Sequence, residues 1–203
     1  MAEFVEGFET LSKMGPCVTI FGSARTPKED GSYALAERLS SIAVKNGYGV
    51  ITGGGGGIME AANKGAFKEQ GISIGLNIQL PFEQVANPFI KTLISFRHFF
   101  CRKVMFLKYT SAVIVLPGGF GTLDELFETL TLVQTHKSTV LPVVLMGLSY
   151  WKGLIDWMKN STLAHNYISP EDMALMTLTD DPEEAIATIN EFYKKRETAE
   201  NFS

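Results

Sequence analysis

AVIVLPGG at residues 112–119 indicates the fold class most clearly, together with the segment that follows it. That segment is FGTLDELFETLTLVQT at residues 120–135. The first of these two stretches is a short, wholly apolar run that stops at a proline and two glycines, which is typical of a buried β-strand. In the second stretch apolar residues such as Leu126 and Leu130 recur at helical spacing, so we expect a helix over 122–135. A buried strand that leads through a glycine-rich turn into an amphipathic helix is the repeating unit of α/β proteins.

The same alternation continues on both sides of this stretch. Apolar, β-branched runs alternate with amphipathic segments, and no linker divides the chain. This pattern predicts a doubly wound, Rossmann-like parallel sheet with helices on both faces, in one domain over 1–203 with a polar tail after about 195. We expect strands at 17–23, 48–54, 72–78, 91–96, 112–119, 140–146 and 176–178, and helices at 32–46, 58–69, 97–109, 122–135, 150–160 and from 182 onward.

The composition is that of a globular protein without a nucleic-acid surface. Of the 203 residues 45% are hydrophobic and 20% are charged, and the net charge of −4 argues against nucleic acid as a partner. Two cysteines are too few for a disulfide scaffold, and the three histidines lack metal-ligand spacing, so we expect no metal site. The first ten residues lack a signal-peptide pattern, and the longest apolar runs are about half the ~20 residues of a membrane span. We therefore expect a cytoplasmic protein that does not enter membranes.

Three predicted strands end in turns that are unusually rich in glycine. Gly22-Ser23 follows the first strand, the glycine run 53–57 follows the second, and PGGFG at 117–121 follows the strand quoted above. Glycine permits positive φ angles and close backbone approach, and each turn leads to a helix N-terminus, which attracts anions. Parallel strands end at the same edge of a sheet, so two such turns favour a phosphate site. The alternative is a set of tight turns that only pack helices on the sheet.

Two well-known nucleotide motifs are absent from these turns. A dinucleotide fingerprint needs an acidic residue ~20 positions downstream, at the end of the next strand. Here the first carboxylate after that strand is Glu83, which lies too far on. A P-loop needs Gly-Lys followed by Ser or Thr, which these turns do not contain. We therefore expect neither a nicotinamide cofactor nor a P-loop nucleotide site.

Charged residues suited to catalysis flank the turn at 117–121. Glu125 lies one turn into the helix that Thr122 is expected to begin; the alternatives are a capping box with Thr122 and an ordinary solvated glutamate. Arg102 and Lys103 lie on the preceding helix, beside its apolar face. Such a pair is suited to clamp a phosphate or to orient a leaving group, and the alternative is a solvated basic patch.

The order and spacing of five motifs give the chain a family resemblance. PGGFGTLDE at 117–125 resembles the PGGxGTxxE motif of the LONELY GUY (LOG) family, whose members are often called possible lysine decarboxylases. The other four motifs are FGSA at 21–24, TGGGGGIMEAANKGA at 52–66, LPFEQ with NPF at 80–89, and FCRKVMF at 100–106. The resemblance covers the chain from about residue 17 to the helix after Pro182, and the region 80–89 is more similar to the bacterial-type branch.

The resemblance implies an enzyme that hydrolyses the N-glycosidic bond of cytokinin riboside 5′-monophosphates and, in many members, of AMP. The products are the free base and ribose 5-phosphate. The resemblance implies no metal and no organic cofactor, and it implies a homodimer. Two alternatives stay open at this stage, namely a general purine nucleotide 5′-monophosphate nucleosidase and a non-catalytic protein that binds a nucleotide or the molybdenum cofactor.

The resemblance also implies roles for individual residues. Glu125, the last residue of the signature, and Arg102 match the catalytic residues of the family. Asp124 is the one departure within the signature, since the family often has Glu there, and it keeps the charge. The residues implied in substrate binding are Ser23, Gly54, Gly55, Gly56, Gly57, Glu83, Arg102, Lys103, Gly118, Gly119, Phe120, Gly121, Thr122, Leu123, Asp124 and Thr131. The ring of Phe120 is suited to stack on a purine.

The two helices predicted at 97–109 and 122–135 carry more apolar residues than one sheet face should cover. This excess favours an interface between two copies of the chain, and the alternative is a thick core layer. The apolar residues concerned are Phe99, Phe100, Phe106, Phe127 and Leu132.

Overall fold

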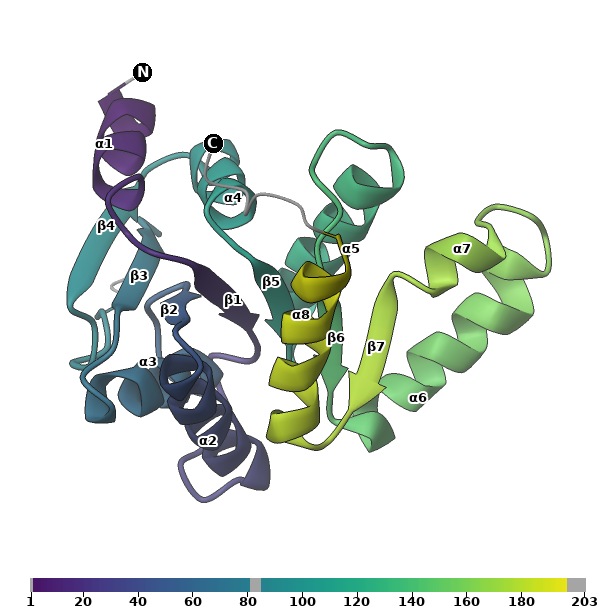
Figure 1. Cartoon of the computed structure of the whole chain (residues 1–203), viewed down its shortest axis with the longest axis horizontal. Coiled ribbons are helices and arrows are strands. Elements are labelled where there is room, and N and C mark those ends of the chain that lie inside the picture. Colours follow the sequence, from purple (N-terminus) through teal and green to yellow (C-terminus); the bar gives the residue numbers. More distant parts are fainter. Residues whose placement is uncertain (1, 81–84, 197–203) are drawn as a thin grey trace.

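The computed structural model describes residues 2–80 and 85–196, and within them it confirms the predicted doubly wound sheet. Seven strands form one sheet in the order β4-β3-β2-β1-β5-β6-β7, and all six pairings are parallel (Figure 1). The strands are β1 (Cys17–Phe21), β2 (Gly49–Thr52), β3 (Ser73–Ile78), β4 (Thr92–Phe96), β5 (Ala112–Val115), β6 (Val143–Met146) and β7 (Met176–Thr179).

Helices cover both faces of this sheet, as expected. One face packs against α2 (Gly31–Lys45), α3 (Ile58–Lys68) and α8 (Pro182–Arg196). The opposite face packs against α1 (Ala2–Leu11), α4 (Phe99–Lys108), α5 (Phe120–Gln134) and α6 (Leu148–Trp157). Helix α6 continues into a π-helical turn (Met158–Leu163), and the short helix α7 (Pro170–Met173) precedes β7.

The side chains of β5 show how the core is divided between the two faces. Val113 and Val115 belong to the apolar cluster shared with α4, α5 and α6, whereas Ala112 and Ile114 belong to the cluster shared with α2, α3 and α8. Successive side chains of a strand point to opposite faces, so a strand that is covered on both sides is apolar throughout. This is why the strand-forming runs of the sequence are continuous rather than alternating.

The direction of the strand order reverses at the centre of the sheet. The chain runs outward from β1 through β2 and β3 to β4, and then returns to place β5 on the other side of β1 (Figure 1). In doubly wound sheets, ligands bind in the crevice at the carboxyl ends of the strands where this reversal occurs. Those strands end here at Phe21 and Val115, so the turns that contain Gly22 and Pro117 meet at this crevice.

The predicted elements differ from the observed ones mainly at their ends. β5 ends at Val115, before the glycines that the expected strand 112–119 included. Helix α5 begins at Phe120, with Gly119 as its N-cap, and not at Thr122. Helix α7 lies outside the predicted elements, and the expected polar tail lies beyond the described residues from 197 onward.

Helix α1 also lies outside the predicted elements, and packing explains why it forms. Leu11 is fully buried, the rings of Phe4 and Phe8 stack with centroids 5.8 Å apart, and Phe4 lies 6.1 Å from the ring of Phe100 in α4. A ten-residue helix is marginal in isolation, so these tertiary contacts stabilise it. In the part of the chain that the structure describes, no helix has the length and apolar character needed to cross a membrane.

Candidate active site

A cavity of about 760 Å³ opens at the carboxyl ends of β1 and β5. Its wall is formed by the turn after β1, the start of α3, one side of α4, the first turn of α5, and Tyr150 of α6. Small-molecule sites commonly have volumes of roughly 300–1,000 Å³, so the space suits a ligand of nucleotide size. The cavity therefore lies where the topology of the sheet predicts a binding site.

The first turn of α5 presents free backbone amides to this cavity. The N–H groups of Thr122 and Leu123 both donate to the carbonyl of Gly119 at 3.0 Å. The N–H groups of Phe120 and Gly121 precede these bonds and have no acceptor within the helix. Among the described residues, no side chain caps the helix at Gly119. Free amides at the positive end of the helix dipole form a site that favours an anion such as phosphate.

Gly118 is required by the packing of the turn before α5. A Cβ atom at this position would lie 2.1 Å from Oγ1 of the buried Thr122. The carbonyl of Gly118 accepts a hydrogen bond from the hydroxyl of Tyr150. The carbonyl and the following N–H of a trans peptide point in opposite directions, so this hydrogen bond also orients the N–H of Gly119. Tyr150 thus holds the turn before α5 from outside the helix.

Ser23 joins the turn after β1 to both glycine-rich turns. Its N–H donates to the carbonyl of Pro117, and its own carbonyl accepts from the N–H of Ile58 at the start of α3, each at 3.0 Å. Its hydroxyl accepts from the N–H of Arg25 at 3.0 Å. The structure therefore brings Ser23 to the cavity wall, as expected, and fixes the backbone of the next two residues beside it.

The glycine run after β2 lies mostly behind the cavity wall. Gly53 lines the cavity, whereas a Cβ atom at Gly56 or Gly57 would meet the backbone of residues 23 and 24. A Cβ atom at Gly54 would meet the side chain of Ile90 and the backbone of Gly75. Gly57 has a φ of 61°, and a Cβ there would lie 2.3 Å from the carbonyl oxygen of Ser23. Substrate contact by Gly54, Gly55, Gly56 and Gly57 stays a prediction, and in the structure Gly57 lets the chain pass close to Ser23.

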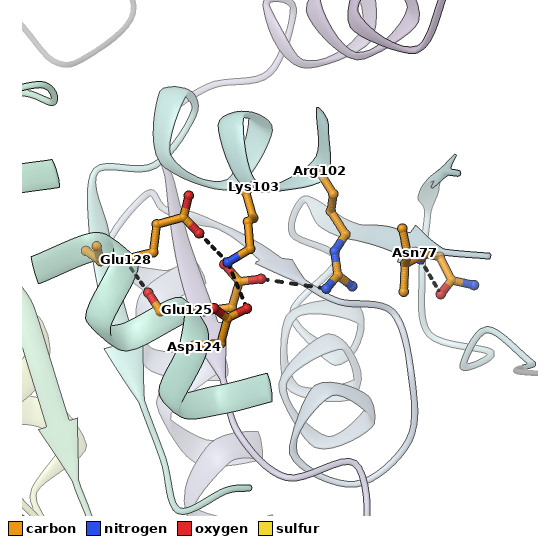
Figure 2. Close-up of polar contacts among 8 residues, drawn as sticks. Asn77, Arg102, Lys103, Asp124, Glu125 and Glu128 are labelled. Atoms are coloured by element: carbon orange, nitrogen blue, oxygen red, sulfur yellow. Dashed lines mark hydrogen bonds and ion pairs between the residues drawn. The ribbon is translucent and has the colours of Figure 1, made fainter. Parts of the chain in front are cut away.

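Arg102 and Glu125 face one another at the cavity wall. Figure 2 shows the two side chains approaching from α4 and α5, with Nη2 of Arg102 3.6 Å from Oε1 of Glu125. Both side chains are largely buried, with exposed fractions of 14% and 8%. The guanidinium lies 5.2 Å and 5.5 Å from the ring centres of Phe99 and Phe106. Among the described residues the buried Nε of Arg102 has no hydrogen-bond partner, so a donor remains for a ligand.

Lys103 is held by three carboxylates of α5. Its ammonium lies 2.8 Å from Asp124 and 3.7 Å from Oε2 of Glu125, and it donates to Glu128 (Figure 2). Burial opposes the charged form of this lysine, but the hydrogen bonds to Asp124 and Glu128 outweigh it and raise the pKa of Lys103. Lys103 therefore stays protonated and supplies a fixed positive charge beside Glu125.

The carboxyl group of Glu125 has a pKa near neutral pH. Burial raises the pKa of Glu125 to about 7, because the charged form loses its hydration, and the nearby Lys103 and Arg102 limit the rise. Burial also lowers the pKa of Arg102, and Glu125 and Asp124 oppose that shift. A carboxyl group that titrates near pH 7 is suited to exchange a proton during catalysis at that pH.

The structure decides between alternatives that the sequence left open. Thr122 is the third residue of α5, so it is not the N-cap, and it forms no capping box with Glu125. Glu125 is buried and therefore is not an ordinary solvated glutamate. Arg102 and Lys103 are largely buried as well, so the basic pair is not a solvated patch.

The remaining expected site residues lie in different places. Gly118, Gly119, Phe120, Gly121, Thr122 and Leu123 line the cavity, and the ring of Phe120 is 92% exposed. Lys103, Asp124 and Thr131 line a second, more open hollow along α5, and the hydroxyl of Thr131 donates to the carbonyl of Phe127. Glu83 lies outside the described residues. Substrate contacts by all of these residues stay predictions.

The cavity also includes residues that were not predicted as site residues, among them the polar side chains of Arg25 and Tyr150. Both follow carboxyl ends of strands next to the reversal point, since Arg25 follows β1 and Tyr150 follows β6. Their position at that sheet edge is the sequence signal that points to them, although no motif marks either residue. Among the described residues no three or more His, Cys, Asp or Glu side chains are grouped so that they could hold a metal ion.

Comparison with known families agrees with this architecture. The family model described as "Possible lysine decarboxylase" matches residues 59–189, which is more than half of the chain. The chain belongs to this family, the LOG family. The match includes α4, the turn before α5 and α5 itself, and so includes Arg102 and Glu125.

Individual relatives of this LOG-family chain carry names of nucleotide-hydrolysing enzymes. A cytokinin riboside 5′-monophosphate phosphoribohydrolase of Mycobacterium tuberculosis is 29% identical over 167 residues, covering 80% of this chain and 88% of the relative. A pyrimidine/purine nucleotide 5′-monophosphate nucleosidase of Escherichia coli is 27% identical over 128 residues. That match covers 58% of this chain but only 28% of the larger relative.

Solved structures with a similar fold include a molybdenum cofactor binding protein from Rippkaea orientalis. The TM-score is 0.64 at 21% sequence identity, and the match covers 89% of this chain and 98% of that protein. At this level of identity the similarity shows a shared fold and carries no statement about the ligand.

Proposed function

We propose that this protein hydrolyses the N-glycosidic bond of nucleoside 5′-monophosphates and releases a free base and ribose 5-phosphate. The observation that carries the proposal is the buried Arg102–Glu125 pair at the wall of a nucleotide-sized cavity. The same wall contains the uncapped start of α5, which suits a phosphate. The enzyme names of the two relatives support the same reaction class.

We assign two roles to Glu125. It activates the attacking water, and it stabilises the positive charge that develops on the ribose. Cleavage of an N-glycoside passes through an oxocarbenium-like state, and a nearby carboxylate stabilises positive charge on the ribose. The ionised carboxylate also accepts a proton from water while the water oxygen bonds to the anomeric carbon. The bond to the base breaks, its electron pair goes to the base nitrogen, and the proton taken from water is returned to the base or to solvent.

We assign to Arg102 the stabilisation of negative charge on the leaving base or on the phosphate. Its guanidinium carries buried donors, and one of them, Nε, has no partner among the described residues. The leaving base gains negative charge and the phosphate is already anionic, and the position of Arg102 suits either one. Anchoring the phosphate at the start of α5 would hold the nucleotide in place, so that positioning as well as charge lowers the barrier.

Among monophosphates, we propose cytokinin riboside 5′-monophosphates and AMP as the substrates. The name of the M. tuberculosis relative, which aligns over most of both chains, favours the cytokinin nucleotides. The E. coli relative favours a general nucleotide nucleosidase as the second candidate. The non-catalytic carrier is the weaker alternative, because a protein that only binds has no need of a buried carboxyl group with a pKa near 7.

The family description suggests lysine decarboxylation, but the cavity does not favour that reaction. A pyridoxal-dependent decarboxylase needs a lysine that forms a Schiff base in the active site. Of the described residues that line the cavity, none is a lysine, and Lys103 faces the second hollow, where three carboxylates hold it.

The decisive experiment is incubation of the purified protein with AMP and with isopentenyladenosine monophosphate, followed by chromatography of the free base. We expect base release from at least one nucleotide, and we expect Glu125→Gln and Arg102→Ala each to lower kcat by about 10²–10⁴ while the circular dichroism spectrum is unchanged. Glu191→Gln, an exposed carboxylate of α8, is the matched control and should keep wild-type turnover. Tight nucleotide binding without release of any base would favour the carrier instead, and near-full turnover by Glu125→Gln would remove the catalytic assignment.

A further inference from the structure

The cations already described around the cavity are matched by carboxylates. Arg102 is paired with Glu125, and Lys103 contacts Asp124, Glu125 and Glu128. A phosphate monoester carries a charge of roughly −1.5 to −2 near pH 7. A group of two cations and three carboxylates does not attract such an anion by itself, so the phosphate end of the cavity needs a further positive charge.

Arg25 supplies an additional cation at the cavity wall. It lies in the loop after β1, its side chain is exposed, and it lines the cavity together with the first turn of α5. None of the ion pairs among the described residues includes Arg25, in contrast to Lys28 in the same loop, which lies 2.8 Å from Glu60. The guanidinium of Arg25 is therefore not neutralised by a described carboxylate.

Hydrogen bonds through Ser23 fix the backbone of Arg25 relative to the turn before α5. The N–H of Arg25 donates to Oγ of Ser23, and the N–H of Ser23 donates to the carbonyl of Pro117, immediately before Gly118. The carbonyl of Ser23 also accepts from the start of α3. Two hydrogen bonds thus connect the Cα of Arg25 to the PGGFG turn, while its long side chain keeps the freedom to close on a ligand.

We propose that Arg25 recognises the 5′-phosphate of the substrate, opposite the free amides of α5, and so makes the enzyme select nucleoside monophosphates over nucleosides. The inference rests on the proposed function and deepens it by assigning a residue to the phosphate. The planar guanidinium donates two parallel hydrogen bonds to phosphate oxygens, which an ammonium group does not do. The amides fix the position of the phosphate, and Arg25 adds the charge that the carboxylate-rich neighbourhood lacks.

The test compares Arg25→Ala, Arg25→Lys and the control Lys28→Ala, which removes one positive charge from the same loop outside the cavity wall. Calorimetry measures the Kd of ribose 5-phosphate, and steady-state assays measure kcat and KM for AMP and kcat/KM for adenosine. For Arg25→Ala we expect Kd and KM to rise about tenfold or more, since hydrogen bonds between charged groups are stronger than those between neutral groups. We expect kcat to change by less than about threefold and adenosine hydrolysis to stay unchanged. Arg25→Lys should recover part of the loss, and Lys28→Ala should behave as wild type.

Two outcomes overturn the assignment. An unchanged Kd for ribose 5-phosphate in Arg25→Ala excludes a phosphate contact, and an equal loss towards AMP and adenosine means that Arg25 contacts the base or ribose instead. The binding arm is independent of turnover. If the wild-type protein binds ribose 5-phosphate but hydrolyses no nucleotide, the proposed reaction fails, while the role of Arg25 in phosphate recognition is still decided by the Kd values.

Discussion

Glu125 is the residue whose surroundings differ most from those of a free carboxylate. It is nearly buried, which favours its neutral form, and it lies within 4 Å of both a guanidinium and an ammonium group, which favour its charged form. The balance raises its pKa to about 7. The carboxyl group therefore changes protonation in the pH range in which the protein would act, and this has consequences for both activity and stability.

The pH dependence of activity reports the protonation state that Glu125 needs. If the carboxylate accepts the proton of water, kcat/KM for AMP should rise with pH up to about 7 and fall about tenfold for each unit below it. Lys103→Met removes a charge that lowers this pKa, so the rising limb should move to higher pH. Initial rates between pH 5 and 9 measure the pH profile of the wild-type protein and its shift in Lys103→Met. A profile that instead falls above pH 7 would show that Glu125 works as an acid.

The same raised pKa makes Glu125 a source of pH-dependent stability. The folded state holds this proton more tightly than the unfolded chain, whose glutamate titrates near 4.5. The contribution to stability is therefore fully present below about pH 4.5 and is lost as the pH rises to about 7, at a rate of about 1.4 kcal/mol for each unit. Relative to Glu125→Gln, the wild-type protein should lose stability between these pH values. Urea titrations of both proteins at pH 5, 6, 7 and 8 measure the difference, and a constant difference contradicts the prediction.

At the scale of elements, one buried side chain of α3 connects several segments behind the glycine run. Oδ1 of Asn63 accepts from Oγ1 of Thr52 at 2.6 Å and from Nδ2 of Asn87 at 2.9 Å. Its Nδ2 donates to Oγ of Ser73 at 2.9 Å and to the carbonyl of Ile74 at 3.2 Å. The amide of Asn63 is thus fully satisfied by hydrogen bonds, and it ties α3 to the end of β2 and the start of β3.

Asn87 extends this network to the glycine run itself. Its N–H donates to the carbonyl of Gly54 at 2.9 Å, and its Nδ2 donates to the carbonyl of Gly55 at 3.0 Å. The run after β2 is therefore held from behind by polar side chains rather than only by its own turn conformation. The network also fastens the chain that follows residues 81–84 onto the same turn.

Loss of Asn63 should destabilise the protein clearly. Asn63→Ala removes the buried hydrogen bonds that Thr52, Ser73 and Asn87 make to its amide. Each buried hydrogen-bonding group that loses its partner atom costs about 1–3 kcal/mol. We expect the free energy of unfolding to fall by at least about 2 kcal/mol, measured by urea denaturation. Asn190→Ala, at an exposed position of α8, should change it by less than about 0.5 kcal/mol. Equal effects of the two variants would show that the buried network is not important for stability.

At the scale of the whole molecule, the apolar surface of α4 and α5 still favours an interface. Of the residues that suggested a second copy of the chain, Phe106 is buried and belongs to the core, so a thick core layer accounts for that residue. Phe99, Phe100 and Phe127 remain exposed, with Phe100 exposed to 60%. Exposed aromatic side chains on two helices that cover the same sheet face are typical of a surface that another protein covers.

We therefore predict a homodimer that buries this surface. Light scattering coupled to size-exclusion chromatography should give about twice the chain mass of 22.3 kDa for the wild-type protein. Phe100→Asp places a charge in the interface and should shift the population towards the monomer. Tyr167→Asp, at a more exposed aromatic residue outside α4 and α5, is the control and should remain dimeric. A wild-type protein that elutes with the mass of one chain contradicts the prediction.

Neighbouring residues along the chain are enough to predict the kind of sheet and to indicate an anion site at its edge. Continuous apolar runs predicted parallel strands covered on both faces, and the PGGFG turn predicted an anion site at a helix N-terminus. These features are local, because burial and turn chemistry are written into neighbouring residues. The ends of β5 and α5 were less certain, since Gly119 and Phe120 are compatible with either a turn or a first helical residue.

The order of the strands in the sheet and the surroundings of each charge depend on contacts between distant segments of the folded chain. β1 pairs with β5, more than ninety residues further along the chain, and this pairing brings the turn of Arg25 to the first turn of α5. The pairing of β5 with β6 likewise brings Tyr150 to Gly118, and the packing of α4 and α5 on one sheet face buries Glu125 beside Arg102. Spacing along a chain does not report contacts between distant segments or the loss of hydration on burial. The raised pKa of Glu125 therefore appears only when the whole chain has folded around it.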